Sequence, residues 1–122
     1  MTDLPVEQES ALDYQEAMKL CSQDEELLTD LIEIFLKDAD SRTKLLARAL
    51  DKNDLKEIGR LAHSLKGLCA NICAKPLKNI SAQMEKAAEK ENLDEIAHLR
   101  EKFDHEFSRL KESLLKQFPP KN

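Results

Sequence analysis

The sequence predicts an all-α fold, an antiparallel up-and-down four-helix bundle with an additional short helix at its N-terminal end. Apolar residues recur at steps of three, four and seven along most of the chain, the spacing of amphipathic helices. No stretch alternates between apolar and polar residues as a half-buried strand would. Only 2 of the 122 residues are glycine, well below the average usage of about 7%. We therefore expect the chain to lack turns with positive φ, such as those of β-hairpins, and Gly-rich phosphate loops.

Length and composition indicate a single domain with no need for disulfides or a metal. We assign residues 1–12 to a flexible leader, 13–118 to the domain and 119–122 to a tail. A net charge of −5 disfavours nucleic acid as a partner, and no apolar run reaches the roughly 18 residues of a membrane span. The polar N-terminus lacks the features of a signal peptide. Three cysteines are an odd count that fits a reducing compartment, so we expect a cytoplasmic protein without membrane contact.

The helix boundaries follow from capping signals. A short helix is expected from about Asp13 to Cys21. Capping boxes, or a proline in the first turn, then mark four helix starts: Ser22 with Glu25, Asp54 with Glu57, Lys75 with Pro76, and Asn92 with Glu95. The last helix ends before Pro119. Short links between long helices place neighbours antiparallel, which favours the up-and-down arrangement.

Each helix carries an apolar stripe that we expect to form the core. In chain order the stripes are Leu28, Leu31, Phe35, Ala39, Leu46 and Ala49; then Leu55, Ile58, Leu61, Leu65, Leu68 and Ile72; then Leu77, Ile80, Met84 and Ala87; then Leu93, Ile96, Leu99, Phe103, Leu110 and Leu114.

One histidine lies opposite such a stripe. At about 100° per residue, five apolar residues of the helix from Asp54 onward lie roughly 140° to 220° from His63: Ile58, Leu61, Leu65, Leu68 and Ile72. Gly59, Arg60, Lys66 and Gly67 all lie within about 60° of it. We therefore place His63 at the centre of a solvent-facing surface, with both glycines of the chain beside it.

The residues around His63 favour a role in chemistry over a plain solvated surface. A glycine inside a helix costs about 1 kcal/mol relative to alanine, and we expect Gly59 and Gly67 to leave room for a folded partner. An imidazole nitrogen is a good nucleophile near neutral pH. Arg60 and Lys66, three residues before and after it, would stabilise a phosphoryl group carried there by charge-assisted hydrogen bonds.

The segment Leu61-Ala62-His63-Ser64-Leu65-Lys66-Gly67 resembles the His-x-Leu-Lys-Gly signature of histidine-containing phosphotransfer (HPt) domains. The likeness covers most of the chain from about Asp13. It continues upstream through Phe35-Leu36-Lys37-Asp38, Leu46, Ala49-Leu50 and Asp54, and downstream through Ala70-Asn71-Ile72, Ala74, Leu77, Ile80, Met84 and Glu85.

The resemblance implies a phosphoryl carrier in two-component signalling, not a kinase. It implies His63 as the phospho-acceptor, Lys66 as the residue that steadies the phosphoryl group, and Gly67 as the gap that admits the partner. Glu85 would either orient the imidazole or simply face solvent. Response-regulator receiver domains would be the partners and would hold the Mg²⁺, so no cofactor is expected on this chain, which we expect to be monomeric. A hybrid sensor histidine kinase is a further candidate partner, and the chain is either free-standing or the end of such a kinase.

The chain departs from the family pattern at Leu68, Cys69 and Cys73, where small residues and a glycine are usual. Leu68 faces the core, and Cys73 leaves the geometry of the helix end open.

Three other functions fit the sequence less well. An autophosphorylating kinase usually has an acid directly after the histidine, where this chain has Ser64, and it needs a Gly-rich ATP lid. Cys69 and Cys73 could chelate a metal, but His63 lies about 120° around the helix from Cys69, and His98 and His105 fit a solvated surface better than a metal site. A structural adaptor bundle shares the fold but predicts no covalent change at His63.

Overall fold

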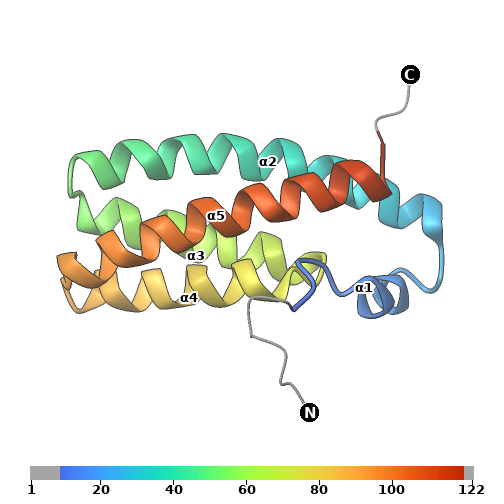
Figure 1. The fold of residues 1–122 in the computed structure, drawn as a ribbon, viewed down its shortest axis with the longest axis horizontal. Coiled ribbons are helices and arrows are strands. Elements are labelled where there is room, and N and C mark those ends of the chain that lie inside the picture. Colours follow the sequence, from blue (N-terminus) through green and yellow to red (C-terminus); the bar gives the residue numbers. More distant parts are fainter. Residues whose placement is uncertain (1–8, 120–122) are drawn as a thin grey trace, which may run out of the picture.

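The computed structural model describes residues 9–119 and contains five helices in this part of the chain. They are α1 (Tyr14–Leu20), α2 (Glu25–Asp51), α3 (Leu55–Asn71), α4 (Lys75–Glu89) and α5 (Leu93–Gln117). Helices α2 to α5 run up and down as a four-helix bundle (Figure 1). The predicted all-α bundle is confirmed, and no described helix has the length and apolarity to cross a membrane.

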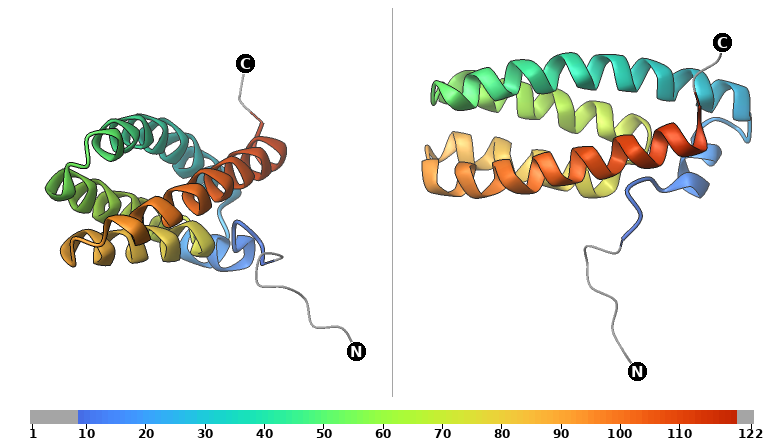
Figure 2. Two further views of the ribbon diagram at one scale, coloured as in Figure 1. Left: turned by 60° about the vertical axis from the view of Figure 1, so that its left-hand side comes forward. Right: turned by 45° about the horizontal axis from the view of Figure 1, so that its top comes forward.

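The short helix α1 lies at one end of the bundle, beside the turn between α3 and α4 (Figure 2). The backbone N–H of Asp13 donates to the carbonyl of Cys73 at 3.0 Å, and Lys75 Nζ pairs with the Asp13 carboxylate at 2.9 Å. The Tyr14 ring lies 6.3 Å from the ring of Phe118 at the end of α5. Helix α1 is therefore attached both to the α3–α4 corner and to the last helix.

The apolar stripes of the four long helices meet along the axis of the bundle. Most predicted core positions are buried. On α2, however, Ile32 is fully buried, while its predicted neighbour Leu31 only packs against the edge of the core. Leu93, predicted to lie in the core, is 44% exposed at the start of α5. Ala11 and Leu12, which the sequence assigns to the leader, are only 4% and 5% exposed. The packed domain therefore starts before Asp13, and residues 1–8 of the predicted leader lie outside the described part of the chain.

The connections correct one prediction from the glycine count. Within residues 9–119, five non-glycine residues have positive φ, and they stand just after the ends of the first four helices: Ser22, Gln23, Asn53, Cys73 and Glu91. At each corner a backbone N–H bonds the carbonyl five residues earlier, as from Asp54 to Ala49 at 3.0 Å and from Ala74 to Cys69 at 2.9 Å. This is the Schellman arrangement, which needs a left-handed residue but not a glycine. The expected absence of positive φ was therefore wrong, because these conformations occur at the tight corners between helices.

The predicted caps are confirmed at two helices and wrong at one. Asp54 Oδ1 accepts from Glu57 N at 3.2 Å, and Asn92 Oδ1 accepts from Glu95 N at 3.1 Å. Helix α2, however, is capped by Asp24, whose Oδ1 accepts from Leu27 N at 3.1 Å. Ser22, the predicted cap, has a φ of 52° because it belongs to the corner that ends α1.

This correction predicts different costs for two neighbouring alanine substitutions. Asp24→Ala removes the side-chain acceptor of the first turn of α2, so it should lower the free energy of unfolding by about 1 kcal/mol. Ser22→Ala removes no such bond and should change it by less than about 0.5 kcal/mol. Urea unfolding followed by circular dichroism measures both. Equal losses for the two variants would contradict the assignment of the cap.

Candidate functional site

His63 stands on the outer side of α3, near the middle of the helix, with its side chain 67% exposed. Its position follows from the register of the helix, because Leu61 and Leu65 are buried in the core on the other side. The start of α3, fixed by the Asp54 cap, sets this register. The predicted exposure of the imidazole is thus observed.

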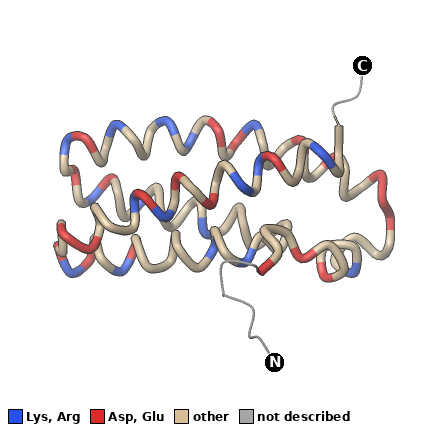
Figure 3. The backbone as a smooth tube through the Cα atoms, viewed as in Figure 1, with Lys and Arg blue, Asp and Glu red and all other residues tan. Residues whose placement is uncertain are grey.

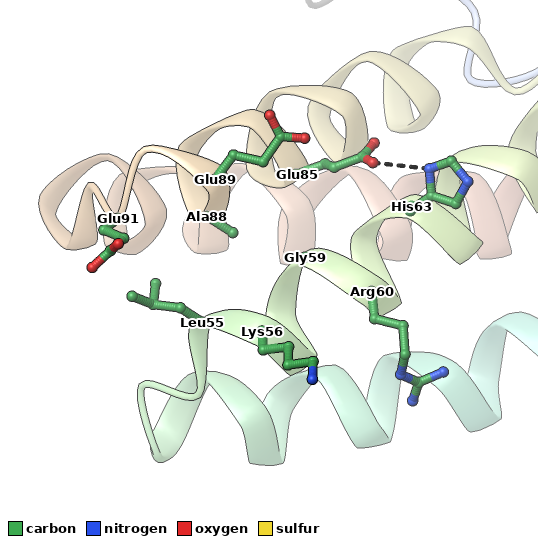
Figure 4. Close-up of a pocket in the computed structure, with 9 residues that line it drawn as sticks. All are labelled: Leu55, Lys56, Gly59, Arg60, His63, Glu85, Ala88, Glu89 and Glu91. Atoms are coloured by element: carbon green, nitrogen blue, oxygen red, sulfur yellow. Dashed lines mark hydrogen bonds and ion pairs between the residues drawn. The ribbon is translucent and has the colours of Figure 1, made fainter.

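A carboxylate on the neighbouring helix bridges the imidazole and a lysine. Glu85 of α4 places Oε2 2.9 Å from His63 Nδ1, and its Oε1 accepts from Lys66 Nζ at 2.8 Å. Figure 4 shows the Glu85 side chain reaching from α4 to the ring on α3. Glu85 is only 21% exposed, so its two oxygens are largely committed to these partners. The prediction that Glu85 could orient the ring has the required contact.

The charge of Glu85 determines which ring nitrogen is free. The hydrogen bond from Lys66, followed by the one from His63, holds the pKa of Glu85 below its usual value of 4.5. An ionised carboxylate only accepts hydrogen bonds, so Nδ1 of the ring must be the donor. In the neutral imidazole the lone pair then lies on Nε2, on the exposed side of the ring. The site therefore presents Nε2 as a nucleophile.

Lys66 lies close to the imidazole but is held by Glu85. It stands three residues after His63, on the side of α3 that faces α4, and its side chain is 32% exposed. Both His63 and Lys66 bond the same carboxylate, so the lysine ammonium and the ring lie along one edge of the site. The role of Lys66 toward a phosphoryl group stays a prediction.

Arg60 does not join this network. Its Nε donates to Glu57 Oε1 at 2.9 Å, and its second nitrogen bonds the other oxygen of the same carboxylate. This pair raises the pKa of Arg60 and lowers that of Glu57. Figure 4 shows the guanidinium turned away from the imidazole. Arg60 lines the same groove as His63, but its guanidinium is paired with Glu57, so its role toward a phosphoryl group stays a prediction.

The two glycines have different surroundings. A Cβ atom on Gly67 would have no neighbour within 4 Å, so the space beside His63 is open there. A Cβ on Gly59 would lie 3.6 Å from Ala88 Cβ of α4, an ordinary contact. The prediction that both glycines face away from packing is therefore right for Gly67 and wrong for Gly59, which lies between the two helices. A helical wheel of α3 alone carries no information about where α4 packs.

An open groove runs between α3 and α4 and ends at His63. Its volume is about 670 Å³. Leu55, Gly59 and Ala88 contribute its apolar part (Figure 4). Its remaining lining residues are polar or charged: Lys56, Arg60, His63, Glu85, Glu89 and Glu91.

The other sequence candidates lie away from this site. All three cysteines are buried and unpaired, and burial raises the pKa of the Cys69 thiol to about 12. No group of three or more His, Cys, Asp or Glu among the described residues could hold a metal ion. His98 and His105 are exposed on α5. Cys73, at the position of the family glycine, has a φ of 61°, a conformation that glycine adopts most easily.

Sequence reasoning missed the bond between Glu85 and Lys66. A signal for it was available, because Ser81 and Ala88 stand four residues before and three after Glu85. Both are buried, and small residues at this spacing mark the side of α4 that packs closely against a neighbour. Glu85 shares that side.

Comparisons with known proteins place this geometry in a family. Residues 30–113 match the Hpt domain. The fold is similar to histidine-containing phosphotransfer protein B from Pseudomonas aeruginosa, with 24% identity, a TM-score of 0.83, and coverage of 92% of this chain and 97% of that chain. It is also similar to a histidine-containing phosphotransfer protein from Medicago truncatula, with 25% identity, a TM-score of 0.77, and coverage of 91% and 79%. No curated protein sequence matches the chain.

The bridging carboxylate predicts the tautomer of His63. At a pH where the ring is neutral, the long-range ¹H–¹⁵N spectrum should show the proton on Nδ1 of His63. The exposed His98 and His105 serve as internal references. In Glu85→Ala the ring loses its acceptor, so the ¹⁵N shifts of His63 should move to those of the two references. Unchanged His63 shifts in this variant would mean that the carboxylate does not set the tautomer.

Proposed function

Because this chain belongs to the Hpt domain family, whose members carry phosphoryl groups in two-component signalling, we propose that it is a phosphorelay intermediate. His63 accepts a phosphoryl group from the aspartyl phosphate of one receiver domain and passes it to another. The observation that carries this proposal is the bond between Nδ1 of an exposed histidine and the carboxylate of Glu85, at 2.9 Å. It leaves Nε2 free and directed at solvent.

The transfer step follows from that tautomer. The lone pair of Nε2 attacks the phosphorus of the aspartyl phosphate, so an N–P bond forms as the P–O bond to the aspartate breaks. The aspartate leaves as a carboxylate. The ring keeps its proton on Nδ1 and becomes positively charged, next to the negative charge of Glu85. Return of the group to a second receiver reverses these bonds.

Glu85 and Lys66 have complementary parts in this step. Glu85 holds the ring in the reactive tautomer and stabilises the positive charge that develops on it, as a carboxylate does for a catalytic histidine. Lys66 is close enough to Nε2 to pair with the incoming phosphoryl oxygens by charge-assisted hydrogen bonds. The receiver supplies its own aspartate and Mg²⁺, so the chain acts as a carrier and not as a kinase.

An apolar surface on α1 and α2 supports docking of a folded partner. Leu20 on α1 and Leu27 and Ile34 on α2 are large apolar side chains left exposed, a feature that interaction sites share. Cys21, which follows Leu20, is 2% exposed and belongs to the core.

The proposal predicts that His63 becomes covalently phosphorylated. The protein is mixed with a panel of receiver domains carrying a ³²P-labelled aspartyl phosphate, and label on this chain should be acid-labile and alkali-stable. His63→Gln should lose the label entirely, since the nucleophile is absent, while His105→Gln should keep it. Absence of transfer from every receiver would overturn the relay proposal and favour an adaptor bundle. Transfer to His63→Gln would overturn the site.

The open space at Gly67 predicts opposite effects on stability and transfer. Gly67→Gln places a long side chain where no atom lies within 4 Å, so the helix should gain up to about 1 kcal/mol of stability. Transfer from a receiver should fall at least about tenfold, because the partner is displaced from Nε2. Thermal unfolding and the rate of label transfer measure the two effects. Ala97→Gln on α5 is the matched control, and equal transfer rates for the two variants would refute the role of Gly67 in access.

A further inference from the structure

The groove between α3 and α4 has a shape and charge pattern that the transfer chemistry does not explain. It extends from Leu55 and Glu91 at one end of the bundle to His63 (Figure 4). Neither Leu55 nor Glu91 is close to the imidazole, and neither takes part in holding Nε2. A volume of about 670 Å³ is enough for several side chains of a partner. The following inference rests on the proposed function.

The two rims of the groove carry opposite charges. On the α3 rim, Glu57 neutralises Arg60, while the exposed Lys56 forms no ion pair among the described residues. On the α4 rim, Lys66 neutralises Glu85, and the exposed Glu89 and Glu91 form no ion pair in the same part of the chain. The groove therefore offers one positive and two negative groups to a partner.

The groove differs in this respect from the other contacts between elements. Lys and Arg alternate with Asp and Glu along the helices (Figure 3). Cross-element ion pairs form from this pattern elsewhere in the described structure: Lys75 with Asp13, Arg100 with Asp51, and Lys111 with Asp40. Lys56 makes no such pair with Glu89 or Glu91 across the groove, so these three charged groups remain available to a partner.

A receiver domain that reaches His63 must cover this groove. Lys56 stands seven residues before His63, which is about 10 Å along the helix axis. A weak, transient interface buries up to about 600 Å² on each partner, which corresponds to a circle of about 14 Å radius. An interface of this size centred on Nε2 therefore includes both rims.

We propose that the α3–α4 groove receives the surface of the receiver domain next to its aspartyl phosphate, and that the charged rims select among receivers. A cognate receiver places a basic side chain over Glu89 and Glu91 and an acidic one over Lys56. Gly59 and Ala88 line the bottom of the groove, and their small size leaves room for side chains of the receiver. The groove thus determines specificity, while His63, Glu85 and Lys66 perform the transfer.

Charge reversal on each rim tests this inference. The variants are Glu89→Lys with Glu91→Lys, and separately Lys56→Glu. Their matched controls on the exposed side of α5 are Glu101→Lys with Glu112→Lys, and Lys116→Glu. Transfer from a panel of phosphorylated receivers gives kcat/KM for each pair of proteins. Labelling by phosphoramidate, a small donor that needs no docking, reports whether His63 itself is intact.

The groove variants should lose about tenfold or more in kcat/KM with cognate receivers, and the order of preference within the panel should change. These losses should shrink as salt is raised, because exposed charges are then screened. The α5 controls should keep the wild-type order, and phosphoramidate should label all proteins equally. If groove variants and controls transfer alike, the groove is not the docking surface and the relay proposal stands. If the wild-type protein takes phosphate from phosphoramidate but from no receiver, both proposals fail.

Discussion

The site depends on how closely α3 packs against α4. Gly59 contacts Ala88 across this interface, and Ala62 and Ser81 are buried on the facing sides of the two helices. Small side chains let two helix axes approach, and the approach brings a carboxylate of one helix within 3 Å of an imidazole on the other. A larger residue at these positions would separate Glu85 from both of its partners. The orientation of the imidazole is thus a consequence of helix packing and not of α3 alone.

The same interface separates what the sequence could predict from what it could not. Periodicity placed His63 on the outer side of α3 because one helix suffices to define a side opposite its own apolar stripe. Periodicity could not show that Gly59 packs against Ala88 or that Lys66 bonds Glu85. Both contacts depend on which edge of α3 the next helix covers. The wheel also could not show which group Arg60 binds. Its position on the wheel is close to His63, but Glu57, three residues earlier on the same helix, binds its guanidinium.

The remaining differences between the sequence-based predictions and the structure concern the helix ends, where the local sequence allows more than one interpretation. Ser22 and Asp24 are both good caps, and only the corner that ends α1 decides between them, since it requires Ser22 to take a positive φ. The low glycine count predicted the correct fold class, but the inference that the chain lacks positive φ was too broad. Low glycine content disfavours hairpins, but Asn53, Cys73 and Glu91 adopt left-handed conformations where helices turn back on themselves. These short corners keep α2 to α5 in the antiparallel order that the site requires.

In the proposed transfer, the bond between Lys66 and Glu85 also affects how the lysine meets a phosphoryl group. A free lysine side chain loses about 2 kcal/mol of rotamer entropy when it is fixed in one place. Here the ammonium is already held by a 2.8 Å contact with the Glu85 carboxylate before any partner arrives. Part of the ordering that the proposed transition state demands is therefore present in the resting protein. The advantage proposed for Lys66 over a freely moving cation thus lies in the activation entropy as much as in the attraction between charges.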